Sequence, residues 1–147
     1  MKNTAIIIPT RLSAKRFPNK PLIKIKGIPI IVHVVNRAKE SNVGKVLVAT
    51  PDNEIVDIVN RNGGEAVLTK NDHLSGSDRI YEVYLKELKE DVDLIINLQG
   101  DMPNMNPKCI SKLEKFMRLK DCDIGTLGSL INDKHEIVDT NIVKVQV

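Results

Sequence analysis

Four cationic side chains crowd one short loop near the amino end of the sequence. They are Arg11, Lys15, Arg16 and Lys20, and the loop follows directly on the apolar run 5–8. Like charges this close repel one another unless an anion neutralises them. Guanidinium groups bind phosphate oxygens through a planar fork, whereas ammonium groups act as point charges. The loop therefore predicts a polyphosphate site built from side chains, with an ordinary solvated surface loop as the alternative.

A second group of candidate residues, Gln99, Gly100 and Asp101, comes directly after the apolar run 93–98. Asp101 offers the hard oxygen ligands that Mg²⁺ takes from proteins, usually one or two carboxylates together with substrate phosphates. Gly100 lets the backbone approach a ligand closely. An ordinary Gly-Asp turn explains the same residues. A basic loop at a neighbouring strand end favours the magnesium site over the plain turn.

A third polar stretch, residues 72–79, opens a helical pattern. Ser75 or Ser77 is suited to cap that helix, which is a structural role. Capping leaves His73 and Arg79 unexplained, so these two are candidates for either a functional or a structural role. No Ser/His/Asp or Cys/His set is spaced to suggest a nucleophile, so the chemistry expected here needs no covalent intermediate.

These residues need a scaffold that brings them together, and the hydrophobic pattern predicts one. Strands are expected at 5–8, 45–49, 66–68 and 93–98, with possible further strands at 124–130 and 142–147. Helices are expected at 28–40, 53–62, 77–89 and 107–120. Alternating strands and helices predict an α/β fold with an open, mostly parallel sheet and helices on both faces. The first and fourth strands are continuously apolar, which predicts burial on both faces.

Composition places the chain among single-domain proteins. With 147 residues, 22 Lys and Arg against 19 Asp and Glu, and 3% aromatic residues, neither a nucleic-acid partner nor a membrane is indicated. No secretory signal or bilayer-spanning run is present, so a cytoplasmic location is expected. We therefore predict one nucleotide-binding domain over residues 1–147. Because residue 147 falls inside an alternating strand pattern, the sequence also fits the amino-terminal portion of a longer enzyme.

The ordered motifs resemble those of cytidylyltransferases that activate acidic sugars, most closely the 3-deoxy-manno-octulosonate (Kdo) cytidylyltransferases, or CMP-Kdo synthetases. The longest matches are IIPTR at 7–11, RFPNKPL at 16–22, DHLSGSDR at 72–79 and QGD at 99–101. Shorter ones lie at 31–34, 37–38, 48–50, 63–64 and 143–145. The resemblance runs along the whole chain but covers only the amino-terminal part of such an enzyme.

The resemblance implies a nucleotide-diphospho-sugar transferase fold that transfers CMP from CTP to Kdo, releasing pyrophosphate, for lipopolysaccharide biosynthesis. It implies a CTP site comprising Arg11, Arg16, Lys20, Arg79 and Gln99. Lys20 and Asp101 would be catalytic, and Asp101 would hold the Mg²⁺ cofactor. The Kdo 2-hydroxyl would attack the α-phosphorus in line, by positioning and charge neutralisation.

The sequence departs from the family pattern in two places and leaves alternatives open. Met102 stands where the family usually has Glu, and Ser13 precedes the usual position of the loop serine. The second metal ligand, most Kdo-contacting residues and the homodimer interface of the family would lie beyond residue 147. We therefore expect little or no turnover from these residues alone. The alternatives are a CMP-acylneuraminate synthetase and a non-catalytic nucleotide-binding fragment.

Overall fold

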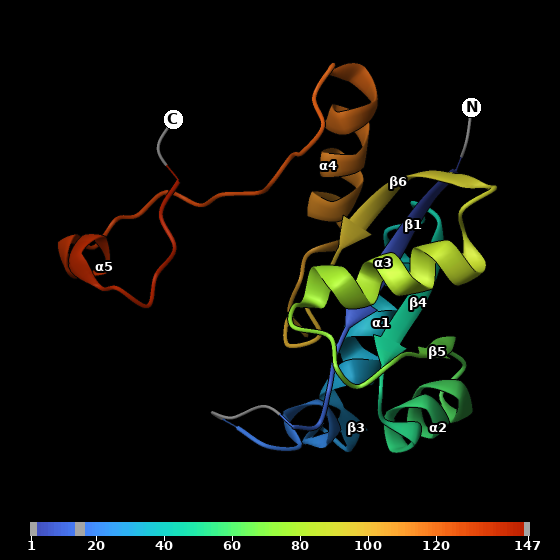
Figure 1. Cartoon of the computed structure of the whole chain (residues 1–147). Helices are drawn as coiled ribbons and strands as arrows, with labels where there is room; N and C mark the ends of the chain where they lie inside the picture. Colours follow the sequence, from blue (N-terminus) through green and yellow to red (C-terminus); the bar gives the residue numbers. More distant parts are fainter. Residues whose placement is uncertain (1–2, 14–16, 146–147) are drawn as a thin grey trace.

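The computed structural model describes residues 3–13 and 17–145. Its centre is a four-stranded parallel sheet in the order β5-β4-β1-β6 (Figure 1). The sheet strands are β1 (Asn3–Pro9), β4 (Lys45–Thr50), β5 (Ala66–Leu68) and β6 (Val92–Asn97). The helices are α1 (Ile30–Glu40), α2 (Asn53–Arg61), α3 (Gly76–Glu87), α4 (Pro107–Leu119) and α5 (Lys134–Val138), with a short 3-10 helix η1 (Lys20–Leu22). A small antiparallel ribbon joins β2 (Lys24–Ile25) to β3 (Ile28–Pro29).

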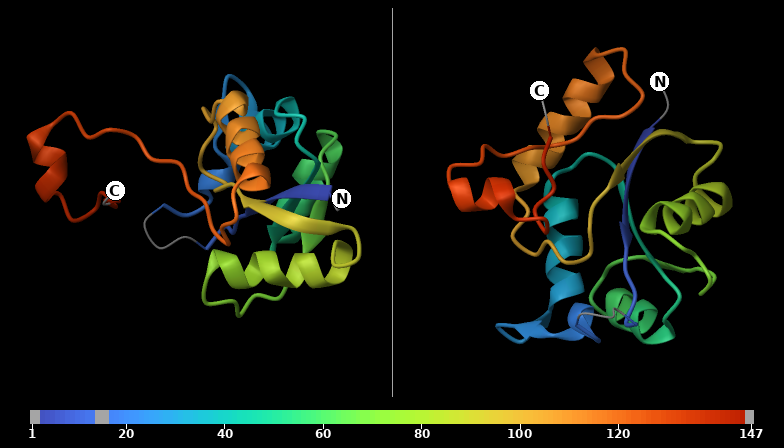
Figure 2. Two further views of the ribbon diagram at one scale, coloured as in Figure 1. Left: turned by 90° about the horizontal axis from the view of Figure 1, so that it is seen from above. Right: turned by 60° about the vertical axis from the view of Figure 1, so that its left-hand side comes forward.

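Helices cover both faces of the sheet, which confirms the predicted α/β class (Figure 2). Alternate strand residues point to opposite faces. Ile6, Ile8 and Val48 belong to the core shared with α1, α2 and α4. Ile7 and Leu47 belong to the core shared with α3. No helix within the described residues is long and apolar enough to span a membrane.

The two continuously apolar strands differ in burial. Residues 4–9 of β1 are all buried, as the sequence predicted for a strand covered on both faces. The same prediction was wrong for β6, where Leu94 and Ile95 are only half-buried. The reason is position, because β1 lies between two strands whereas β6 lies at one edge of the sheet.

The prediction of two possible strands after α4 was wrong for the described residues. Residues 124–130 form no strand, and neither does the described part of 142–147, of which 146–147 lie outside the described residues. Ile124 is 88% exposed and Val143 is 90% exposed. An extended apolar segment becomes a strand only when its backbone groups pair with a neighbour. Here the chain around α5 extends away from the sheet in both Figure 1 and Figure 2.

Local chemistry sets the helix boundaries. α1 begins at Ile30 and not at residue 28, because the two preceding residues form β3 and pair with β2. α2 ends just before Gly63, whose φ of 75° lies in the left-handed region that glycine adopts without strain. Ser75 and not Ser77 caps α3, and its hydroxyl accepts from the Asp78 N–H. The predicted helices are therefore confirmed to within two residues at their ends.

Candidate functional site

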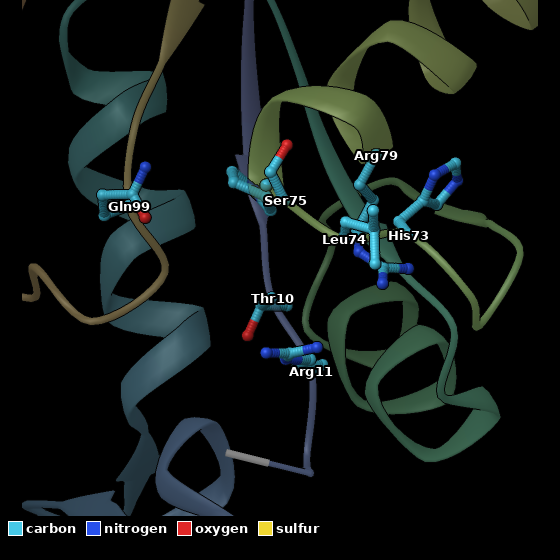
Figure 3. Close-up of a pocket in the computed structure, with 9 residues that line it drawn as sticks. Thr10, Arg11, His73, Leu74, Ser75, Arg79 and Gln99 are labelled. Carbon is cyan, nitrogen blue, oxygen red and sulfur yellow. The ribbon is translucent and has the colours of Figure 1, made fainter. Parts of the chain in front are cut away.

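The carboxyl ends of the parallel strands meet at one edge of the sheet, where ligands bind in open α/β folds. Two adjoining cavities, each of about 190 Å³, open at this edge. Thr10, Arg11 and Gln99 line both of them. The loop-side cavity is completed chiefly by the loop that leads into α3 (Figure 3). The aspartate-side cavity is completed by Lys20 and Asp101 together with Pro21 and Gly100.

Lys20 and Asp101 meet in the aspartate-side cavity although they lie far apart in the sequence. Lys20 Nζ donates to Asp101 Oδ2 over 2.9 Å. Both side chains keep contact with solvent, at 41% and 54% exposure. An exposed pair of this kind contributes little to stability. The structure thus confirms that the basic loop and the carboxylate converge on the same edge, while their roles remain predictions.

A set of backbone hydrogen bonds folds the basic loop back onto the site. The Leu12 N–H donates to Asp52 Oδ2 over 2.8 Å, which anchors the start of the loop. The Asn19 N–H donates to the Leu12 carbonyl over 3.1 Å, which closes the loop and returns Lys20 to the strand end. The predicted phosphate ligand Arg16, with Lys15, lies outside the described residues.

Gly100 lies close to the end of β1, against Thr10 and Pro9. A Cβ at this position would lie 3.0 Å from Thr10 Cβ and 3.2 Å from the Pro9 carbonyl oxygen. These contacts are tight, so a side chain here would push the β6 end away from the β1 end unless its neighbours shifted. Gly100 also lines the aspartate-side cavity, and close approach of its backbone to a ligand stays a prediction.

Arg11 and Arg79 both line the loop-side cavity but differ in environment. Arg79 is 3% exposed, and its Nη1 donates to the Lys70 carbonyl over 2.9 Å and to Thr69 Oγ1. Arg11 is exposed and makes no side-chain hydrogen bond or ion pair with any described residue. Burial lowers the pKa of Arg79, and the nearby Arg11 charge lowers it further, against the opposing effects of Asp52 and Glu82. Two guanidinium groups at one cavity favour an anion there.

His73 is positioned by an acidic residue that the sequence analysis did not single out. His73 Nε2 pairs with Glu82 Oε2, and the Lys70 N–H donates to the same oxygen over 3.0 Å. Burial alone would raise the pKa of Glu82. The hydrogen bonds from His73, Lys86 and Lys70 outweigh it and hold that pKa at about 2. Glu82 is therefore ionised and accepts from each of these donors.

The sequence analysis also missed Asp52. It follows the end of β4, and the rule that singled out Asp101 after β6 would have found it as well. Glu82 gave no such signal, because it lies in the second turn of α3 and its partner His73 lies nine residues earlier in the chain. Its role depends on how the loop before α3 folds back, which no local pattern encodes.

The described residues offer one carboxylate, and no larger ligand cluster, to a divalent cation at this edge. Among residues 3–13 and 17–145, no group of three or more His, Cys, Asp or Glu side chains could hold a metal ion. Asp101 provides one accessible carboxylate beside the cavity. Mg²⁺ usually keeps several waters and takes one or two carboxylates with substrate phosphates. Asp101 therefore fits a magnesium site that a bound triphosphate would complete.

The fold is that of the nucleotidyltransferases. The chain superposes on the structure of CMP:2-keto-3-deoxy-manno-octonic acid synthetase complexed with CTP with a TM-score of 0.74 and 43% identity, covering 79% of this chain and 47% of that one. A cytidylyltransferase from Leptospira borgpetersenii serovar Hardjo-bovis (strain JB197) matches with a TM-score of 0.71, covering 82% and 51%. That second match, at 21% identity, speaks for the fold alone.

Sequence comparison gives the family. The family model described as "Cytidylyltransferase" matches residues 5–147, so the chain belongs to the cytidylyltransferase family. It is 44% identical over 144 residues to 3-deoxy-manno-octulosonate cytidylyltransferase of Rhodopseudomonas palustris (strain BisB18), covering 97% of this chain and 58% of that protein. The 3-deoxy-manno-octulosonate cytidylyltransferase of Wigglesworthia glossinidia brevipalpis is also 44% identical, and the match covers 95% of this chain and 58% of that protein. These findings confirm the resemblance, and the chain spans a little over half the length of these relatives.

Proposed function

We propose that this chain carries the nucleotide-binding part of a CMP-Kdo synthetase, which transfers CMP from CTP to Kdo and releases pyrophosphate. The observation that carries the proposal is the meeting of Lys20 with Asp101 beside Arg11 at the carboxyl edge of the sheet. The similarity to 3-deoxy-manno-octulosonate cytidylyltransferases along nearly the whole chain supports the choice of CTP and Kdo.

In this proposal the chain's own residues act by binding and charge neutralisation. Arg11, Arg16 and Lys20 hold the triphosphate, with Arg79 beneath the cavity supporting the same positive field. Gln99 lies beside the nucleotide. The Kdo 2-hydroxyl forms a bond to the α-phosphorus while the bond from that phosphorus to the β-phosphate bridge oxygen breaks, and pyrophosphate leaves. Orienting the two substrates in this way supplies most of the acceleration expected for phosphoryl-type transfer.

The proposal includes Mg²⁺ as cofactor, with Asp101 as the protein ligand. When bound, the ion neutralises charge on the phosphate oxygens. Lys20 already contacts Asp101 Oδ2, so the ammonium group must release this oxygen or share it with an incoming cation. A nucleotide phosphate offers Lys20 another partner. Nucleotide binding at Lys20 and cation binding at Asp101 therefore favour one another.

Calorimetry on the chain with CTP in the presence and absence of Mg²⁺ tests this proposal. We expect CTP binding that strengthens with Mg²⁺, and no comparable binding of ATP. A parallel assay for pyrophosphate release offers Kdo and an acylneuraminate as acceptors to protein of the relatives' full length. Turnover with Kdo supports the proposal, and turnover with the neuraminate alone supports the CMP-acylneuraminate synthetase alternative. Failure of the chain to bind CTP would refute the nucleotide site itself.

One observation favours a second candidate, a non-catalytic nucleotide-binding fragment. Asp101 is the one acidic side chain among the described residues that line the aspartate-side cavity, and Met102 follows where the family usually has Glu. A site with half its metal ligands binds nucleotide more readily than it turns it over. Tight CTP binding by the chain without pyrophosphate release, in contrast to the longer protein, would support this candidate.

The remaining parts of the proposal concern the setting of the reaction. The product CMP-Kdo would serve lipopolysaccharide biosynthesis. The reaction would take place in the cytoplasm, where CTP is made. The full-length family forms homodimers by resemblance, so we propose a homodimer for the protein of that length. Sedimentation of the longer protein checks this assembly.

A further inference from the structure

One wall of the loop-side cavity has little packing of its own. This wall is formed by His73, Leu74 and Ser75, from the loop between β5 and α3 (Figure 3). The Leu74 side chain is 96% exposed and buries almost nothing. A loop without buried apolar contacts opens readily unless hydrogen bonds hold it. The shape of the wall therefore depends on the groups that fix its backbone from behind.

Lys70, at the start of this loop, is held on both sides of its backbone by α3. Its N–H donates to Glu82 Oε2 over 3.0 Å, and its carbonyl accepts from Arg79 Nη1 over 2.9 Å. His73, three residues further on, pairs with the same Glu82 oxygen. A single carboxylate thus ties the two ends of a short segment to one point on the helix.

Glu82 itself lies outside the loop-side cavity. It lines a separate hollow behind the loop, together with Lys70, Tyr81 and Lys86, and only His73 lines both spaces. The second carboxylate oxygen accepts from Lys86 Nζ over 2.5 Å. Glu82 is only 11% exposed and has a partner on each oxygen. It reaches the candidate site only through the loop that it holds.

We propose that Glu82 is a positioning residue for the nucleotide site, which fixes the loop 69–75 in the conformation that forms the cavity wall. The inference rests on the proposed function, because it assigns CTP to this cavity. The loop offers an apolar side chain, a hydroxyl and an imidazole, groups suited to a nucleoside. Lys20 lines the aspartate-side cavity and Arg11 lines both, so the phosphates fit at the strand end that the two cavities share. Loss of Glu82 should therefore weaken contacts to the nucleoside and spare those to the triphosphate.

The test compares two ligands in two variants of the same helix. Glu82→Gln removes the charge and replaces one carboxylate oxygen by an NH2 group, which cannot accept from the donors around it. Glu87→Gln makes the same charge change on an exposed residue of α3 and is the matched control. Calorimetry measures CTP and inorganic tripolyphosphate binding to each. We expect Glu82→Gln to weaken CTP binding about tenfold, the effect of roughly one charged hydrogen bond, with tripolyphosphate binding within about twofold of the original.

Hydrogen exchange at the Lys70 amide provides a readout that needs no ligand. Glu82→Gln should speed exchange there while amides in β1 keep their protection. Glu82→Asp keeps the charge on a shorter side chain and should recover part of the CTP affinity. Glu82→Asp also tests the inference if Glu82→Gln does not fold.

Four outcomes would overturn the inference. Unchanged Lys70 exchange in both Glu82 variants removes the positioning role, whatever the chain binds. Equal losses for CTP and tripolyphosphate indicate a general structural effect. If the original chain binds CTP and the Glu82 variants bind it equally well, this inference fails alone. If the original chain binds no CTP, the proposed function fails and takes this inference with it.

Discussion

At the amino edge of the sheet, Arg118 of α4 is surrounded by acceptors. Its Nη1 pairs with Asp93 Oδ1 over 2.7 Å, its Nε with Glu114 Oε1 over 3.2 Å, and its Nη2 donates to Thr4 Oγ1 over 2.8 Å. The hydrogen bond that Arg118 donates to Asp93 is the main reason that the pKa of Arg118 is raised. At the carboxyl edge, the Arg11 side chain has no such partner among the described residues and lies near a second guanidinium, that of Arg79.

The comparison separates charges that the fold neutralises from charges that the described residues leave unneutralised. Arg118 connects α4 to β1 and β6, and its charge is neutralised where it lies. The carboxyl edge keeps positive charge that the protein itself does not neutralise, which costs some stability and favours an anion. Lys20 and Asp101 are intermediate, because they pair with each other but remain accessible. Variants at the two edges should therefore affect different properties.

The largest expected effect is at Asp101. Asp101→Asn removes the one acidic side chain among the described residues that line the aspartate-side cavity, and we expect metal-dependent pyrophosphate release by protein of the relatives' length to fall at least ~100-fold. Stability should change by less than about 0.5 kcal/mol, because the ion pair with Lys20 is exposed. Asp93→Asn at the opposite edge is the control for charge. Full activity in Asp101→Asn would remove this residue from the metal site.

Arg79 sharpens the comparison because it lies at the carboxyl edge but is bonded like Arg118. Arg79→Met would leave Thr69 Oγ1 and the Lys70 carbonyl without a donor in a buried site. We expect urea unfolding to show a loss of about 2–3 kcal/mol in the free energy of unfolding. If the variant were as stable as the original protein but bound CTP more weakly, Arg79 would act mainly on the ligand.

Glu82 makes part of the stability depend on pH. Its pKa is about 2 in the folded protein against an ordinary value of 4.5, so the folded state binds this proton more weakly than the unfolded state. The contribution is present above about pH 5 and is lost as the pH falls toward the folded pKa, with a total on the order of 3 kcal/mol. Urea unfolding between these limits should give a shallower pH dependence for Glu82→Gln. Identical slopes would contradict the lowered pKa.

The smallest expected effects come from single substitutions of Arg11 and of Arg118. Arg11→Ala should weaken CTP binding about tenfold and leave stability within about 0.5 kcal/mol. Arg118→Met should do the reverse, lowering stability by about 1 kcal/mol without changing CTP affinity. Lys24→Ala, on the exposed ribbon before α1, controls for loss of a surface cation. If Arg118→Met weakened CTP binding as much as Arg11→Ala, the division between the two edges would not hold.

The sequence by itself determined the order and type of the main elements. Apolar runs of strand length alternate with amphipathic helices, and this pattern admits few arrangements other than a parallel sheet covered on both faces. The same pattern placed Lys20 and Asp101 after strand ends, and the parallel rule brings such positions to one edge. The similarity of its motifs to those of Kdo cytidylyltransferases was likewise legible from residue order alone.

The tertiary structure decided everything that depends on partners distant in the chain. Whether residues 124–130 pair as a strand depends on a neighbour, which the periodicity of the segment does not specify. Gly100 contacts Thr10 and Glu82 holds Lys70 and His73 only because the chain folds back at those points. Arg11 and Arg79 are the same residue type, yet burial and available acceptors fixed Arg79 within the fold and left Arg11 exposed.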